Sequence, residues 1–344
     1  MRAVPGPPGP PWDRKLAGRL DSLVVESDIL AGNPLGDPAR RPLYVYVPVG
    51  IGDQAVPSVY VIQGMTGQLD MWRNREAFEP MMFERVDDLF TAGCPPAVVV
   101  FVDAWTSYGG SQFINSEGTG RYMDYLCDEI VPFVDERYPT VPERDRRGLT
   151  GKSSGGYGAM VVPMLRPDVF AGLASHAGDA LFEACYLPEF PLTTRILRDE
   201  FEGSFETFFE RLRAAEWFDS SWHAPLNTYA MAACYSPDPT RPGKALLPFD
   251  TGTGRLVNEV WAHWLEWDPV RMAPRHVDAL KSMRCIYLDA GRSDEFYLDL
   301  GAQAFAQELD RAGADFDLVL FDGAHGHLQY RYPRAIRTLA EALT

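Results

Sequence analysis

Several features are scarce in this chain, and each scarcity excludes a class of protein. The Pro/Gly-rich opening, residues 1–12, lacks the apolar core of roughly 7–15 residues that a signal peptide needs. No run reaches the ~20 apolar residues of a membrane span. Lys and Arg number 32 against 48 Asp and Glu, a formal net charge of −16, which argues against nucleic acid or an anionic membrane as a partner.

Cysteine is also sparse, and no metal motif is present. The five cysteines are scattered and none forms a CxxC pair. This pattern favours free thiols in a reducing compartment over a single disulfide. We therefore expect a soluble, cytoplasmic protein with no metal, and the sequence leaves homo-oligomerisation open.

The 344 residues, 46% of them hydrophobic, are enough for one large α/β domain. A hairpin of early strands is predicted at 23–30 and 43–47. Apolar runs at 59–62 and 97–102 predict strands covered on both faces, and a helix broken near Pro132 is predicted over 122–138. Further strands are expected at 147–150, 170–175, 284–289 and 317–321, and further helices after 155 and at 205–214 and 300–312.

This alternation of strands and helices predicts an α/β fold, with a mostly parallel central sheet and helices on both faces. Residues 1–18 are expected to be an extended tail, and residues 19–344 the α/β domain. The regular pattern stops near Leu181 and resumes near Met283. We interpret residues 181–275 as an inserted cap.

Residues 151–155, Gly-Lys-Ser-Ser-Gly, form a G-x-S-x-G pattern between a predicted strand and a predicted helix. That context makes the middle residue, Ser153, a nucleophile on a strained turn, where side chains at the flanking glycines would collide with the neighbouring strand. A phosphate loop is the first alternative, but Arg146 stands where its leading glycine is required. An ordinary Gly/Ser turn is the second.

An activated serine needs a base, and the base needs an orienting acid. In α/β hydrolases the chain order is serine, acid, histidine. Two acids, Asp289 and Asp294, follow the predicted strand at 284–289, and we prefer Asp294 because it lies one loop farther out. Beyond them are only His325 and His327, of which His325, between glycine-containing turns at a strand end, is the preferred base.

The oxyanion of an acyl-transfer reaction needs two backbone N–H donors. One is expected from Ser154, the residue after the nucleophile. The other is expected from Met65, in the loop Gln63-Gly-Met-Thr-Gly67 after an early strand, for which a plain glycine turn is the alternative.

Taken together, these motifs resemble the putative-esterase (esterase-D-like) family of the α/β-hydrolase superfamily. The matching segments are residues 63–66, 151–158, 291–296 and 323–325. The resemblance implies an α/β-hydrolase fold, with Ser153 as nucleophile, Asp294 as acid, His325 as base, and Met65 and Ser154 as oxyanion donors.

The expected function is that of a serine carboxylic-ester hydrolase without a cofactor, acting on a small-molecule or carbohydrate-linked ester. An acyltransferase of the same family and a catalytically silent binding protein are the alternatives. Trp261, Trp264 and Trp267 of the predicted cap fit a packing face or a sugar platform. Further candidates for the pocket are Trp105, His176, Asp179 and His327, although His176 and Asp179 fit strand-end loop residues equally well.

Overall fold

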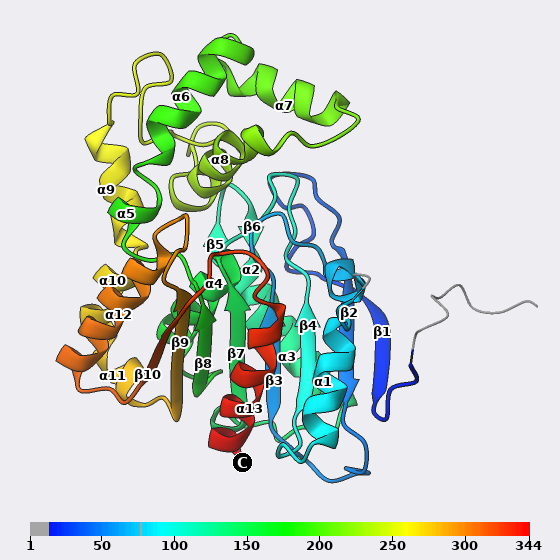
Figure 1. Ribbon diagram of the computed structural model, residues 1–344. Helices are drawn as coiled ribbons and strands as arrows, with labels where there is room; N and C mark the ends of the chain where they lie inside the picture. The colour runs from blue at the N-terminus through cyan, green and yellow to red at the C-terminus, as the bar shows by residue number, and fades with distance from the viewer. Residues whose placement is uncertain (1–13, 76–77) are drawn as a thin grey trace, which may run out of the picture.

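The centre of the molecule is an eight-stranded, mostly parallel sheet, as the sequence predicts. A computed structural model describes residues 14–75 and 78–344, so most of the predicted tail lies outside the described residues. The strand order is β1-β2-β4-β3-β7-β8-β9-β10 (Figure 1). β1 pairs antiparallel with β2 and β2 with β4, and every pair from β4 to β10 is parallel.

The elements have the following bounds. The strands of the sheet are β1 Arg19–Glu26, β2 Arg40–Val47, β3 Ser58–Ile62, β4 Val98–Val102, β7 Arg147–Lys152, β8 Gly172–His176, β9 Cys285–Gly291 and β10 Asp317–Phe321, and a separate small ribbon consists of β5 Asn115–Ser116 and β6 Gly120–Arg121. The α-helices are α1 Met82–Thr91, α2 Tyr122–Asp124, α3 Val131–Arg137, α4 Ser154–Leu165, α5 Phe182–Cys185, α6 Glu189–Glu200, α7 Phe205–Ala214, α8 His223–Tyr235, α9 Asn258–Glu266, α10 Pro269–Met272, α11 Val277–Lys281, α12 Leu298–Ala312 and α13 Tyr332–Leu343. Short 3₁₀ turns are η1 Leu69–Arg73, η3 Arg144–Arg146, η4 Ser220–Trp222, η5 Ala273–Arg275 and η6 Gln329–Arg331, and η2 Tyr125–Ile130 is a π-helical stretch.

Helices cover both faces of the sheet because successive strand side chains point to opposite sides. In β3, Val59 and Val61 pack in one apolar cluster with α1 and α13. Tyr60 and Ile62 belong to another cluster, with the helices that follow Tyr122 and with α4. Every side chain of β3 and β4 is buried, which explains why these strands appear in the sequence as continuous apolar runs.

Most predicted bounds lie within three residues of the observed ones, and two predicted elements differ more clearly from the structure. The first strand ends at Glu26 rather than continuing to residue 30, because Ser27 begins a turn in which its Oγ accepts a hydrogen bond from the Leu30 N–H at 2.9 Å. The predicted helix over 122–138 is a composite of α2, η2 and α3. α3 begins with Pro132 in its first turn, where the missing N–H interrupts the regular hydrogen-bond ladder.

The segment between β8 and β9 contains helices α5 to α11 and a long loop at residues 236–257, and in Figure 1 helices α6, α7 and α8 lie beyond one end of the central strands. Within it, Trp264 is fully buried and donates its Nε1–H to Ser236 Oγ at 2.8 Å. Trp261 and Trp264 both pack edge-on against Phe190. Of the two interpretations of these tryptophans, the structure therefore shows the packing face.

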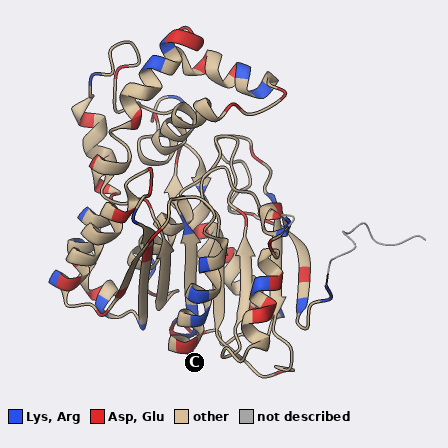
Figure 2. Ribbon diagram, in the orientation of Figure 1, with Lys and Arg blue, Asp and Glu red and all other residues tan. Residues whose placement is uncertain are grey.

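Charged residues lie mainly on the outer helices, where acidic and basic residues are interleaved, while the central strands carry few of them (Figure 2). All five cysteines are free thiols, as expected, and four of them are buried. Among the described residues, no helix combines the length and the apolar character that crossing a membrane would require.

Candidate active site

Ser153 lies on a strained turn between β7 and α4. Its backbone has φ 58° and ψ −126°, a conformation that residues with a Cβ rarely adopt. The neighbouring glycines are sterically required: a Cβ on Gly151 would approach the Gly155 carbonyl group to 2.5 Å, and a Cβ on Gly155 would approach the Ile62 carbonyl oxygen to 2.5 Å. The Ser153 N–H donates to the His176 carbonyl oxygen at 2.9 Å. The turn thus holds the hydroxyl of Ser153 at the end of β7.

His325 connects this serine to a buried carboxylate. Its Nε2 lies 3.1 Å from Ser153 Oγ, and its Nδ1 lies 2.9 Å from Asp294 Oδ2. When Nδ1 carries the proton, it donates a hydrogen bond to Asp294. Nε2 is then free to accept a hydrogen bond from the serine hydroxyl. The structure therefore brings together the serine, acid and histidine that the sequence singles out, from the loops after β7, β9 and β10.

Several contacts fix the acid and the imidazole. The Asp294 side chain is fully buried, and its Oδ1 accepts the Phe296 N–H at 2.9 Å. The His325 main-chain N–H donates to Glu295 Oε2 at 2.9 Å. The Phe296 ring lies edge-on to the imidazole at 4.9 Å. Together these contacts restrict rotation of the two side chains that must stay aligned.

Asp289, the alternative acid, serves a separate buried network. Its carboxylate contacts His176 Nδ1 at 2.7 Å, the Tyr287 hydroxyl at 2.8 Å and Arg331 Nε at 3.0 Å. Burial by itself raises the pKa of Asp289, but His176 and Arg331 outweigh it and hold that pKa below its ordinary value. Asp289 therefore acts as the centre of a buried polar cluster.

The loop after β3 lies against the nucleophile. A Cβ on Gly64 would approach Ser153 Cβ to 3.3 Å and the Lys152 carbonyl oxygen to 2.9 Å, so only glycine fits there. Met65 follows directly, and both Met65 and Ser154 line the cavity in front of Ser153. The structure thus places the two expected oxyanion donors at the same cavity.

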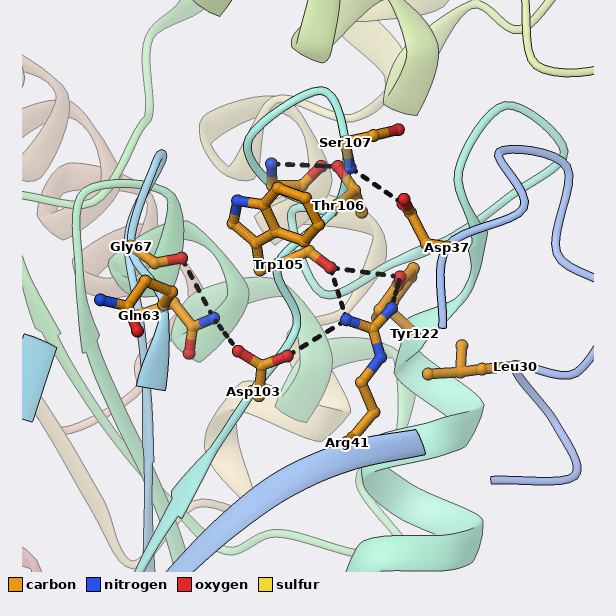
Figure 3. A network of polar contacts seen from close by, with 12 residues as sticks. Leu30, Asp37, Arg41, Gln63, Gly67, Asp103, Trp105, Thr106, Ser107 and Tyr122 are labelled. Atoms are coloured by element: carbon orange, nitrogen blue, oxygen red, sulfur yellow. Dashed lines mark hydrogen bonds and ion pairs between the residues drawn. The ribbon is translucent and has the colours of Figure 1, made fainter. Parts of the chain in front are cut away.

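A buried ion pair between Arg41 and Asp103 supports the loop after β3 (Figure 3). Arg41 Nη1 lies 3.2 Å from Asp103 Oδ2, and both side chains are about 95% buried, at 4% and 5% exposure. Asp103 Oδ1 accepts the Gln63 amide at 3.3 Å. Gln63 also donates to the Gly67 carbonyl oxygen at 3.4 Å, which bridges the two ends of the loop.

The cavity has a volume of about 220 Å³. It lies between the strand ends and the helical segment that follows β8, and it is lined by Gly64, Met65, Gly67, Met71, Lys152, Ser153, Ser154, Asp179, Cys185, Tyr186, His223, Asn227, Phe296, Leu298, His325 and Tyr332. Burial lowers the pKa of Lys152, against the opposing effect of three nearby carboxyls. Burial, and secondarily His325, lowers the pKa of His223.

Of the four further pocket candidates, only Asp179 lines this cavity. His176 is fully buried beneath the turn, with its ring bound to Asp289. His327 is exposed and adopts a left-handed backbone with φ 56°. Trp105 has its carbonyl bound to Arg41 at 2.8 Å (Figure 3), and its side chain, 37% exposed, lies outside the cavity. These three residues do not line this cavity, since strand-end position does not determine which way a side chain points.

Sequence reasoning missed the cavity residues that come from the helical segment after β8. Cys185, Tyr186, His223 and Asn227 line the cavity, and none of them lies in a recognisable motif. The available signal was only positional, since an insertion between the serine-bearing and acid-bearing strands emerges at the active-site edge of the sheet.

Solved structures with 13–16% identity define the fold. The fluorophosphonate-binding serine hydrolase F of Staphylococcus aureus matches with a TM-score of 0.57 at 16% identity, covering 95% of this chain and 99% of that one. An S-formylglutathione hydrolase from Agrobacterium tumefaciens gives 0.54 at 15%, covering 96% and 98%. A ferulic acid esterase from Anaeromyces mucronatus gives 0.52 at 13%, covering 98% and 95%. The fold is that of the α/β hydrolases.

The chain belongs to the family described as "Putative esterase", whose model matches residues 38–336. Family and fold together identify the protein as an esterase, as the sequence motifs suggest.

Proposed function

We propose that the protein is a serine carboxylic-ester hydrolase that works through a Ser153–His325–Asp294 triad and a covalent acyl-enzyme. The observation that carries this proposal is the continuous series of contacts, 3.1 Å from Ser153 Oγ to His325 Nε2 and 2.9 Å from His325 Nδ1 to Asp294 Oδ2. Nucleophile and base in hydrogen-bond reach, with the base oriented by a third group, is the arrangement that activates a serine hydroxyl.

The mechanism follows from these positions. His325 Nε2 takes the proton as Ser153 Oγ bonds to the ester carbonyl carbon, and the carbonyl oxygen becomes an oxyanion that the N–H groups of Met65 and Ser154 stabilise. The C–O bond to the alcohol then breaks, and His325 returns the proton to the departing oxygen. Water, deprotonated by His325, attacks the acyl-enzyme in the same way and releases the acid together with Ser153.

The substrate class we propose is a small-molecule or carbohydrate-linked ester, because a cavity of about 220 Å³ accommodates only a compact group next to the serine. The same residues would serve an acyltransferase if an alcohol replaced water in the second step. Comparing the products formed with and without an added alcohol distinguishes hydrolysis from acyl transfer.

The experiment that tests the proposal is pre-steady-state hydrolysis of p-nitrophenyl acetate. An acyl-enzyme intermediate with slow deacylation releases p-nitrophenol in a burst, with an amplitude approaching one equivalent per chain, before the steady state. Absence of any hydrolysis over a panel of acetyl esters, feruloyl esters and the thioester S-formylglutathione would instead favour a catalytically silent binding protein.

Replacing the acid gives a prediction with a matched control. Asp294→Asn should lower kcat by roughly 10⁴-fold, because the imidazole then loses the partner that fixes its tautomer. Asp289→Asn should instead lower the free energy of unfolding, by about 3 to 5 kcal/mol, because it leaves the buried Arg331 without its ion-pair partner. Steady-state kinetics and thermal unfolding of both variants measure this. Equal losses of kcat at unchanged stability would remove Asp294 from the role.

A further inference from the structure

Asp179 is a buried carboxyl in the wall of the active-site cavity. It follows β8, the strand next to β7, and therefore emerges beside Ser153. Asp179 is only 6% exposed, yet it lines the cavity. It plays no part in the mechanism above, so its presence at this point calls for another explanation.

The protein uses only one of the two carboxyl oxygens of Asp179. Oδ2 accepts hydrogen bonds from the Tyr186 hydroxyl at 2.8 Å, Gln112 Nε2 at 3.1 Å and the Ser154 hydroxyl at 3.3 Å. Within residues 14–75 and 78–344, no group donates to Oδ1 and no cation forms an ion pair with the carboxylate. Burial raises the pKa of Asp179, and its neutral donors and the nearby His325 only partly oppose that rise.

Asp179 Oδ1 is not one of the fully buried polar atoms without a partner in the described part of the chain, so it is accessible from the cavity. Oδ2 is saturated by its three donors, so Oδ1 is the oxygen that remains for a ligand in the cavity. Asn227 also lines the cavity. Asn227 Nδ2 donates to Glu189 Oε2 at 2.8 Å, and no group in residues 14–75 and 78–344 donates to the Asn227 carbonyl oxygen. Each residue thus has an acceptor oxygen without a donor among the described residues, and although the Lys152 ammonium lines the same cavity, it forms no ion pair with Asp179, so Asp179 Oδ1 can accept a hydrogen bond from a ligand.

Resting on the proposed function, we propose that Asp179 binds a donor group, a hydroxyl or an ammonium, carried by the acyl part of the ester substrate. The acyl part is favoured over the alcohol because it stays bonded to Ser153 after the alcohol has left, and Asp179 is hydrogen-bonded to the very next residue, Ser154. The space next to Ser153, about 220 Å³, suits a short acyl group. Asp179 is thus a specificity-determining residue that selects hydroxyacyl or aminoacyl esters over alkyl esters of the same size.

The test uses isosteric substrates that differ only at the terminal position of the acyl chain. Ethyl butyrate, ethyl 3-hydroxypropionate and ethyl 3-aminopropionate end in a methyl, a hydroxyl and an ammonium group, and a shorter set consists of ethyl propionate, glycolate and glycinate. Acid release in a pH-stat gives kcat/KM for each ester. In at least one set, the wild-type protein should prefer the hydroxyl or the ammonium ester over the methyl ester by about 10-fold or more.

The variant arm measures whether Asp179 causes the preference. Asp179→Asn should reduce the ratio of donor-ester to methyl-ester kcat/KM by about 10-fold for the ammonium ester, and by less for the hydroxyl ester, because the amide carbonyl still accepts a hydrogen bond. The matched control is Asp268→Asn. Asp268 is also buried, but its carboxylate caps the N–H groups of Leu181, Phe182 and Val270 outside the cavity, so its substitution should leave the ratio unchanged.

The outcomes distinguish failure of the Asp179 inference from failure of the proposed esterase function. A ratio unaffected by Asp179→Asn, or lowered as much by Asp268→Asn, overturns the inference, since a merely structural role slows all esters alike. Equal wild-type rates on all three esters in both sets overturn it without any variant, which keeps the test valid if Asp179→Asn does not fold. If the wild-type protein hydrolyses no ester at all, the proposed function itself fails.

Discussion

Ser153→Ala should abolish ester hydrolysis while leaving the fold intact. Without the hydroxyl no acyl-enzyme forms, and since members of a triad act as a unit, kcat should fall by roughly 10⁴-fold or more. The substitution keeps the Cβ, so the backbone cost of the turn at φ 58° is the same in both proteins. The only side-chain hydrogen bond lost among the described residues is the one to His325 at 3.1 Å.

Steady-state rates on p-nitrophenyl acetate and thermal unfolding curves measure this prediction together. The melting temperature should change by no more than a few degrees, because one partly exposed hydrogen bond contributes about 1 kcal/mol. Ser154→Ala is the matched control variant. The Ser154 hydroxyl donates to Asp179, but the proposed catalytic contribution of Ser154 is its backbone N–H, which alanine retains. A Ser153→Ala protein with a tenth of the wild-type rate would show that another residue is the nucleophile.

His325→Ala should cause a loss of the same order, roughly 10⁴-fold or more in kcat, because no other group accepts the serine proton. His327→Ala is the control. The two histidines are separated by one residue, but His327 is exposed and contacts neither Ser153 nor Asp294 within hydrogen-bond distance. We expect His327→Ala to retain the wild-type rate within about 3-fold.

The comparison of these two variants is read from kcat on one ester at saturating concentration. Loss of activity in the His327 variant, with the His325 variant still active, would reverse the assignment of the base. Comparable losses in both would point to a disrupted loop after β10, which the melting temperatures of the two proteins would reveal.

The serine, acid and histidine could be found from the sequence because each carries a local signal. Ser153 is marked by the glycines that its turn requires, and the structure shows that neither Gly151 nor Gly155 has room for a side chain. Asp294 and His325 are marked by chain order and by their position one loop beyond a strand. Strands such as β3 and β4 were equally visible because burial on both faces leaves an uninterrupted apolar run.

The wall of the cavity could not be predicted in this way, because it depends on how the helical segment after β8 packs on the sheet. His176 illustrates the difficulty. It ends β8, as Ser153 follows β7, but its ring points into a fully buried network with Asp289 and Arg331 rather than into the cavity. Asp179, three residues later, does line the cavity. Only the tertiary structure separates these two cases.

The central claim is that Ser153 is the nucleophile, and active-site labelling tests it most directly. The protein is incubated with a fluorophosphonate, and the adduct is located by tandem mass spectrometry of its peptides, with the Ser153→Ala variant treated in parallel. We predict one adduct per chain, on Ser153, and none on the variant. An adduct on Ser154 or any other residue, or no adduct while a control serine hydrolase is labelled under the same conditions, would contradict the claim.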